Sequence, residues 1–172
     1  ALDPDVFKRM AGRDESPDTV LDAIHTAEQS GFAPVKINTV IKRGDNDGEI
    51  VPLARQFHGT DHILRFIEYM DVGTRNGWNM EQVTPAKEIF DTIHDEMPLE
   101  PISPNYPGEV ATRYRYLDGD GEIGIISSVT NPFCRNCTRL RLSPDGKIYT
   151  CLFSTKGTDL RNPIRSGEDD SG

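Results

Sequence analysis

The fold is decided by VKINTVIKRGDNDGEIVPLARQFHGTDHILRFIEY, residues 35–69. Two short segments rich in apolar and β-branched residues, which is typical of buried strands, lie at its ends: VKINTVI at 35–41 and ILRFIEY at 63–69. Between them the turn RGDNDG leads to a predicted helix over about 49–57. A strand, a helix and a strand in this order predict a right-handed crossover and a parallel sheet with helices outside.

Helix signals flank this unit on both sides. Ser16 and Pro17 provide an N-cap and a proline at the first helical position, and apolar residues follow at helical spacing until Gly31. A further helix is predicted over 84–97, beginning at a Thr-Pro pair. The first half of the chain therefore indicates the α/β class.

The pattern changes after the predicted helix that ends near residue 97. The next twelve residues, PLEPISPNYPGE, contain four prolines and are expected to be a loop or linker, with a domain boundary near 98–108. Beyond it, ATRYRYL, the turn DGDG and EIGIISSV predict antiparallel strands. The expected regions are a β/α domain over 1–97, a second region over 98–165 and a disordered tail over 166–172.

All three cysteines lie in NPFCRNCTRLRLSPDGKIYTC, residues 131–151. The run SPDGK predicts a three-residue hairpin loop in which Ser143 pairs with Lys147 and the glycine is left-handed. Because side chains alternate along a strand, this register places four side chains on one face. They are Cys137, Arg139, Arg141 and Cys151. A two-residue turn would move Cys151 to the other face, while Cys134 lies on a preceding loop, as in other C-x-x-C metal sites.

The charge is distributed unevenly along the chain. The formal net charge is -9 at pH 7, but residues 131–165 contain seven Lys or Arg and two Asp, so this segment carries +5 and the remainder -14. The pattern indicates a small anionic ligand near the cysteines and no nucleic-acid partner. No apolar run approaches the roughly 20 residues that span a bilayer. We therefore expect a cytoplasmic protein without a membrane partner.

Three thiols without a fourth allow several interpretations. A structural zinc site requires a further ligand, and all four histidines lie at least 40 residues upstream of the first cysteine. A zinc site would therefore require the fold to place one of these histidines beside the cysteines. Three unrelated buried thiols are a second alternative. A four-iron cluster held by three cysteines would leave one iron open to a ligand, which is chemically useful.

Three segments carry a family resemblance: KINTVIKRGDNDGEI, ILRFIEYMDVGTRNGW and the cysteine segment. In the last, C-x-x-C is followed by thirteen residues and a third Cys, with R-L-R shortly after the second. Together they resemble the molybdenum cofactor biosynthesis protein A family, which are GTP cyclases of the radical S-adenosylmethionine (SAM) class. The resemblance runs from the first residues to about Arg165.

The resemblance implies a fold and a reaction. We expect the C-terminal part of an incomplete (β/α) radical-SAM barrel, followed by an antiparallel β-rich region that carries a 4Fe-4S cluster. In the full-length enzyme, a lyase, SAM and a second, N-terminal 4Fe-4S cluster supply a 5'-deoxyadenosyl radical. GTP becomes 3',8-cyclo-7,8-dihydroguanosine triphosphate, which passes to cyclic pyranopterin monophosphate synthase. A homodimer is the expected assembly.

The chain departs from the family pattern at both ends. The C-x-x-x-C-x-x-C motif of the N-terminal cluster and the usual C-terminal glycine pair are absent from this sequence. We therefore expect a piece truncated at both ends that is inactive alone, and no residue in it is assigned a catalytic role.

By motif match, the resemblance implies three groups of site residues. The metal ligands are Cys134, Cys137 and Cys151; the GTP-binding residues are Lys36, Arg139, Leu140 and Arg141; the SAM-binding residue is Met70.

Three positions also allow plainer interpretations. Lys36 alternates with apolar neighbours, as a lumen-facing residue would, but a surface lysine shows the same pattern. Met70 would equally suit a core position. Arg65 would either reach the same cavity or pair with an acidic neighbour, and it is not assigned to the site.

A rival function is a non-catalytic zinc or iron-sulfur module that fixes the hairpin for a partner.

Overall fold

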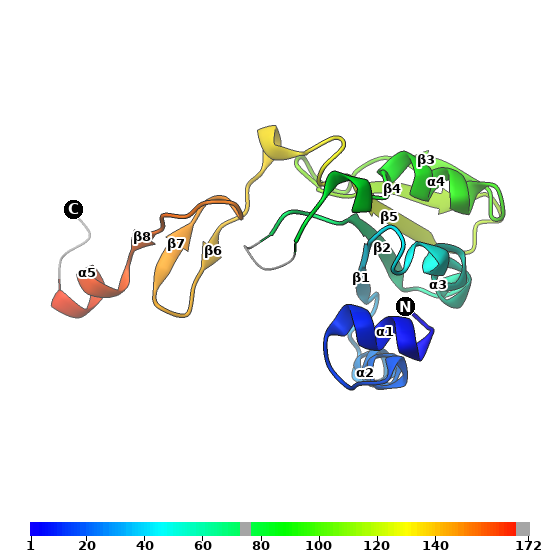
Figure 1. The fold of residues 1–172 in the computed structure, drawn as a ribbon, viewed down its shortest axis with the longest axis horizontal. Coiled ribbons are helices and arrows are strands. Elements are labelled where there is room, and N and C mark those ends of the chain that lie inside the picture. Colours follow the sequence, from blue (N-terminus) through cyan, green and yellow to red (C-terminus); the bar gives the residue numbers. More distant parts are fainter. Residues whose placement is uncertain (73–76, 168–172) are drawn as a thin grey trace.

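One mixed sheet of five strands forms the body of the protein (Figure 1). The computed structural model describes residues 1–72 and 77–167. Within this part the strands follow the order β1-β2-β5-β4-β3. Their bounds are Lys36–Ile41 (β1), Ile63–Glu68 (β2), Leu99–Ile102 (β3), Thr112–Tyr116 (β4) and Glu122–Ile126 (β5).

The strands β1, β2 and β5 are parallel. Ile63 of β2 lies opposite Lys36 of β1 on one side and Glu122 of β5 on the other. The predicted parallel pair is therefore confirmed, and helix α3 (Ile50–Phe57) lies in the predicted crossover between β1 and β2. The position of β5 beside β2 was not predicted, because nothing local in the sequence connects segments so far apart.

The C-terminal part of the sheet is antiparallel. β4 and β5 form the predicted antiparallel pair, with Thr112 opposite Ile125. The segment expected to be a loop or linker contains β3, which pairs with β4, so that interpretation was wrong for residues 99–102. Pro101 is tolerated because β3 is an edge strand, in which not every N–H is needed for pairing. The sheet takes strands from both sides of residue 97, and the division into 1–97 and 98–165 stays a prediction.

The helices begin at the predicted signals. Ser16 caps α2, because its Oγ accepts a hydrogen bond from the backbone N–H of Asp18 at 3.2 Å. An unpredicted helix precedes it and is capped by Asp3, whose carboxylate accepts hydrogen bonds from two backbone N–H groups. The bounds are Pro4–Ala11 (α1), Pro17–Gln29 (α2), Ala86–His94 (α4) and Arg161–Ser166 (α5), with short 3-10 turns at Asp47–Glu49 (η1), Met80–Gln82 (η2) and Cys134–Asn136 (η3).

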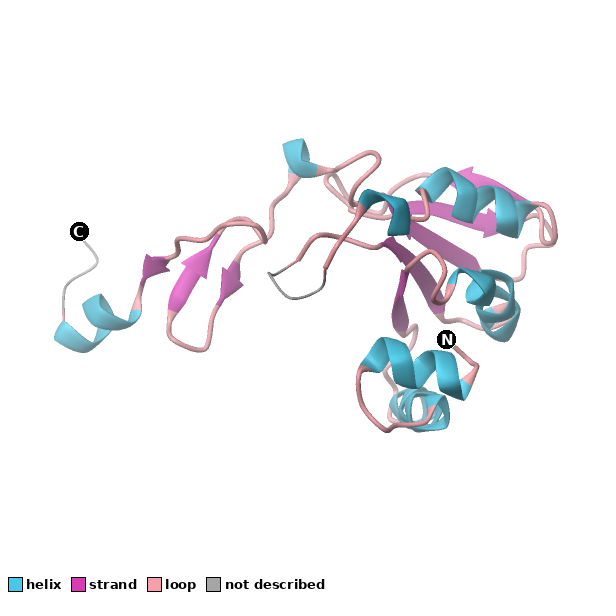
Figure 2. Cartoon of the chain, in the orientation of Figure 1, coloured by secondary structure: helices cyan, strands magenta, loops and turns pink. Residues whose placement is uncertain are grey.

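The helices α3 and α4 pack against one face of the sheet (Figure 2). Alternate residues of β2 and β5 meet them in the core. The central core residues are Ile50, Leu53, Leu64, Phe66, Ile89, Ile93, Ile123 and Ile125. The intervening residues of the same strands, including Arg65 and Gly124, face the other side. None of the helices in the described part of the chain has the length and apolar character needed to cross a bilayer.

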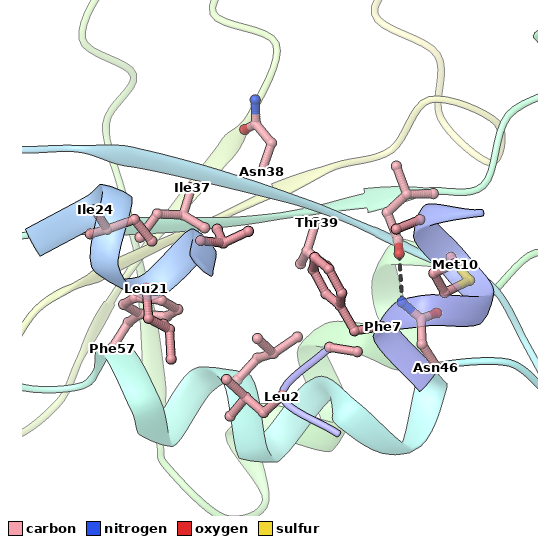
Figure 3. Close-up of a pocket in the computed structure, with 15 residues that line it drawn as sticks. Leu2, Phe7, Met10, Leu21, Ile24, Ile37, Asn38, Thr39, Asn46 and Phe57 are labelled. Carbon is pink, nitrogen blue, oxygen red and sulfur yellow. Dashed lines mark hydrogen bonds between the residues drawn. The ribbon is translucent and has the colours of Figure 1, made fainter. Parts of the chain in front are cut away.

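Strand β1 separates two environments. On the helix side, an apolar cavity of about 270 Å³ lies between β1 and the helices α1, α2 and α3. Figure 3 shows Phe7, Leu21 and Phe57 gathered there, whereas Asn38 extends to the opposite side of β1. The side of β1 that carries Lys36 and Asn38 is called the polar face below, and Ile37, Thr39 and Ile41 lie on the helix side.

The C-terminal residues form a small arm that extends from the sheet (Figure 1). Its three antiparallel strands are β6 (Arg141–Leu142), β7 (Lys147–Tyr149) and β8 (Thr158–Asp159). The predicted hairpin register is confirmed: Arg141 lies opposite Tyr149, and the Ser143 N–H donates to the Lys147 carbonyl at 2.9 Å. The ladder is shorter than expected, since β6 begins at Arg141 and β7 ends at Tyr149.

The end of the chain differs from the predicted disordered tail over 166–172. Ser166 is the last residue of α5, and Gly167 caps that helix in the left-handed conformation. Residues 168–172 lie outside the described residues. The tail prediction was therefore wrong at its first two residues.

Gly146 fixes the hairpin turn. Its φ is +81°, and a Cβ at this position would lie 2.7 Å from the Cβ of Arg161. We expect Gly146→Ala to cost the arm about 1–2 kcal/mol, because strain and a steric clash act together. Hydrogen exchange at the Ser143 amide should accelerate accordingly. The matched control is Gly48→Ala, where a Cβ would meet nothing within 4 Å; equal exchange in both variants would contradict the role of Gly146.

Candidate functional site

A cavity of about 390 Å³ lies between the polar face of the sheet and the base of the arm. All three cysteines line it. The other residues used below that line it are Asn38, Arg65, Met70, Ser128, Phe133, Arg139 and Arg141. The structure therefore brings together six of the eight residues singled out from the sequence.

Parallel strands explain why these side chains meet. β2 and β5 run in the same direction, so the segments that follow them leave the sheet at the same edge. Met70 follows β2, and Ser128 follows β5 as the chain enters the cysteine segment. Residues 58 positions apart in the sequence therefore line the same cavity.

The first two cysteines lie on a tight turn. The 3-10 helix η3 begins at Cys134, and the Cys137 N–H donates to the Cys134 carbonyl at 3.3 Å. Cys134 and Cys151 are exposed, and Cys137 is half-buried. Arg139, Arg141 and Cys151 line the cavity together with Cys137, as expected, although only Arg141 lies within the paired part of the hairpin.

Arg139 shapes the surroundings of the Cys137 sulfur. Its Nε lies 3.4 Å from Cys137 Sγ, and its guanidinium stacks over the Phe133 ring at 4.6 Å. The pKa of the Cys137 thiol is lowered, chiefly by a hydrogen bond from the backbone N–H of Arg139 and next by one from the Arg139 side chain. Burial of the thiol raises the pKa and partly offsets this effect. The positive charges of Arg139 and Arg141 lower the pKa further. A lowered pKa favours the thiolate, the form that binds iron or zinc.

A single ion and a cluster place different demands on the three thiols that line the cavity. Zinc bonds to sulfur at about 2.3 Å and therefore draws its ligands together around one point. Among the described residues, no group of three His, Cys, Asp or Glu side chains converges in this way. An iron-sulfur cluster bonds each thiolate to a different iron and needs more widely spaced sulfurs. Three thiolates around one cavity, with two arginines beside them, are a suitable donor set.

No histidine supplies a further ligand at this cavity within the described residues. His58 pairs with Asp118 at 2.8 Å, and His94 Nδ1 accepts the Leu99 N–H at 3.0 Å. His62 is buried, and His25 lies near Glu28. The structure thus gives no support to a zinc site completed by one of these four residues.

The sequence matches a known family. Residues 62–172 match the family described as Molybdenum Cofactor Synthesis C. The chain belongs to this family.

Curated relatives extend the match over almost the whole chain. A GTP 3',8-cyclase of Acidothermus cellulolyticus is 52% identical over 168 residues, which are 98% of this chain and 46% of the relative. Proteins of the same name from Xanthomonas campestris and Staphylococcus haemolyticus are 48% and 44% identical, over 98% and 99% of this chain and 50% of each relative. The chain spans about half the length of the curated relatives it matches.

Two residues assigned by family resemblance do not line the cavity. Lys36 shares the polar face of β1 with Asn38, two residues away, but it is not part of the cavity wall. Leu140 lies between the two arginines and is 62% exposed, because alternation turns it away from them. A role for either residue in GTP binding stays a prediction.

Arg65 is the residue that the sequence left undecided. It lines the cavity and also forms an ion pair with Glu109, with Arg65 Nη2 3.5 Å from Glu109 Oε1. Its Nε, like Arg141 Nη1 and Ser128 Oγ, is buried without a hydrogen-bond partner. These unpartnered polar atoms indicate a polar ligand. The signal in the sequence was a charged residue inside the apolar strand ILRFIEY.

Arg139 should control the reactivity of Cys137. The lowered pKa gives Cys137 a larger thiolate fraction near neutral pH, and that fraction falls as the pH drops through the lowered pKa. In metal-free protein we expect Arg139→Gln to shift the pH profile of Cys137 alkylation to higher pH and to slow alkylation at pH 7 several-fold. Peptide mass mapping with iodoacetamide measures the rate. Arg165→Gln in α5 is the control, and an unchanged profile in Arg139→Gln would refute the assignment.

Proposed function

We propose that this chain is the cluster- and nucleotide-binding half of a GTP 3',8-cyclase of molybdenum cofactor biosynthesis. The observation that carries the proposal is the cavity that holds all three cysteines beside Arg139 and Arg141. Support comes also from relatives of that name, 52% and 48% identical over nearly the full chain.

In this proposal the cysteines hold a 4Fe-4S cluster. Cys134, Cys137 and Cys151 are the ligands, and Arg139 favours the thiolate form of Cys137 before metal binds. With three protein ligands, such a cluster would leave one iron without a protein ligand, and this iron would supply Lewis-acid chemistry toward a base such as guanine. The chain itself contributes the placement of the thiolates and a cavity wall that partly excludes water.

The arginines are proposed to bind the triphosphate. Arg139 lies two residues before Arg141, the first residue of β6; both line the same cavity, while Leu140 between them is exposed. Guanidinium groups bind phosphate through charge-assisted hydrogen bonds that are stronger than neutral ones. Arg141 Nη1 is buried without a partner, which suits a donor awaiting an anionic ligand. Lys36 is proposed to contact GTP from the neighbouring part of the sheet.

The remaining parts of the reaction are assigned to the full-length enzyme. We propose that the parallel strands belong to an incomplete radical-SAM barrel, and that Met70 contacts SAM at the end of β2. SAM and the second 4Fe-4S cluster are proposed to belong with the half of the relatives that this chain does not span. The isolated chain is therefore proposed to be inactive, and hand-off to cyclic pyranopterin monophosphate synthase and a homodimer belong to the full-length enzyme.

The alternative is a metal module without catalytic function. It predicts a filled coordination sphere and no response to nucleotide. We expect anaerobic reconstitution to give about four irons and four sulfides per chain. Electron paramagnetic resonance of the reduced protein should then show a signal that GTP changes. Uptake of zinc in place of iron, or a cluster signal indifferent to GTP, would favour the module.

Loss of an arginine should weaken nucleotide binding. We expect Arg141→Gln in the reconstituted protein to lower the affinity for GTP by about 10- to 100-fold, because a hydrogen bond to a charged group contributes about 1.5–3 kcal/mol. Equilibrium dialysis with labelled GTP measures the change. Arg165→Gln, which keeps the cavity intact, serves as the control. Equal affinities for the two variants would show that the triphosphate binds elsewhere.

A further inference from the structure

Glu68, the last residue of β2, is completely buried and accepts several hydrogen bonds. Its Oε1 accepts from the Ala86 N–H at 2.7 Å and from the Thr130 hydroxyl at 2.5 Å. Its Oε2 accepts from the Val129 N–H at 2.7 Å and from the Thr130 N–H at 2.8 Å. Both carboxylate oxygens are thus occupied by donors from two distant parts of the chain.

The donors belong to two segments, helix α4 and the stretch between the cavity-lining residues Ser128 and Pro132. Ala86 is the first residue of α4, so the carboxylate satisfies a backbone N–H that the helix leaves free. Val129 and Thr130 are the last residues before the cysteine segment begins at Asn131. Met70, which lines the cavity, is two residues beyond Glu68 in the sequence.

We propose that Glu68 is a positioning residue for the cysteine site. Its hydrogen bonds hold the residues that precede the cysteine segment against the end of β2. They thereby set the distance between Cys134 and Met70, which both line the cavity. This inference rests on the proposed function, because it assigns Glu68 to the positioning of the cluster ligands. Glu68 itself does not line the cavity and is not a catalytic residue.

The chemistry of the donors requires a carboxylate at this position. An ionised carboxylate only accepts hydrogen bonds and offers four acceptor sites, which match four donors. In Glu68→Gln one oxygen becomes an NH₂ group facing N–H or O–H donors, and buried N–H groups then lose their partners. The variant keeps the size of the side chain, so the change lies in hydrogen bonding and not in packing.

The test separates positioning from general stability. The two variants are Glu68→Gln and Ile50→Val, a core substitution in α3 that removes one methyl group from a side chain only 2% exposed. In reconstituted protein we measure the rate at which an iron chelator removes the cluster under anaerobic conditions. We expect Glu68→Gln to lose its cluster about tenfold faster than the wild type, as for other residues that support metal ligands. The rate of cluster loss in Ile50→Val should stay within about twofold of the wild-type rate.

A metal-free measurement tests the tether independently of the cluster. In cluster-free protein we expect faster hydrogen exchange over residues 129–137 in Glu68→Gln, but not in Ile50→Val. If Glu68→Gln fails to fold, Thr130→Val removes only one donor, and roughly fivefold faster exchange over the same residues is expected.

The outcomes distinguish this inference from the proposed function. Equal cluster loss and equal exchange in Glu68→Gln and Ile50→Val would overturn the positioning role. A wild-type protein that takes up no iron would refute the proposed function, while the exchange measurement would still decide whether Glu68 holds the cysteine segment.

Discussion

The pairing of β5 with β2 is the constraint on which the rest of the structure depends. It joins segments about 60 residues apart and gives both strands the same direction. The chain therefore leaves both strands at one edge of the sheet, where the Glu68 carboxylate ties the two exits together. The covered face supplies the core, and the opposite face supplies a polar wall for the cavity. Without this pairing the cysteine segment would have no fixed position.

Local signals in the sequence predicted local structure well. Ser16 and Pro17 marked a helix start, and SPDGK set the register of a hairpin whose turn needs a glycine with positive φ. In these cases the determining contacts lie within a few residues. The order of strands in the sheet depends on contacts between distant segments, which periodicity does not encode. That is why β3 was taken for a linker and the position of β5 was missed.

The candidate site was predicted in the same uneven way. Cysteine spacing and hairpin alternation grouped Cys137, Arg139, Arg141 and Cys151, and all four line the cavity, although the ladder itself reaches only Arg141. The sheet side of the cavity was harder to predict. A polar residue inside a strand shows which face it occupies only after the helices have been assigned to the other face. Arg65 illustrates this, because it both lines the cavity and pairs with an acidic residue, Glu109, whereas the sequence offered these as alternatives.

The short arm also has a consequence for the order of folding. Its hairpin contacts join residues four to eight positions apart, and hairpins of this kind close within microseconds. The β2–β5 pairing has a much higher contact order and forms more slowly. During synthesis the sheet strands leave the ribosome before the arm, which gives the slower β2–β5 pairing time to form. We therefore expect the hairpin to close beside a sheet that is already paired, so that the cavity is completed in the last step of folding.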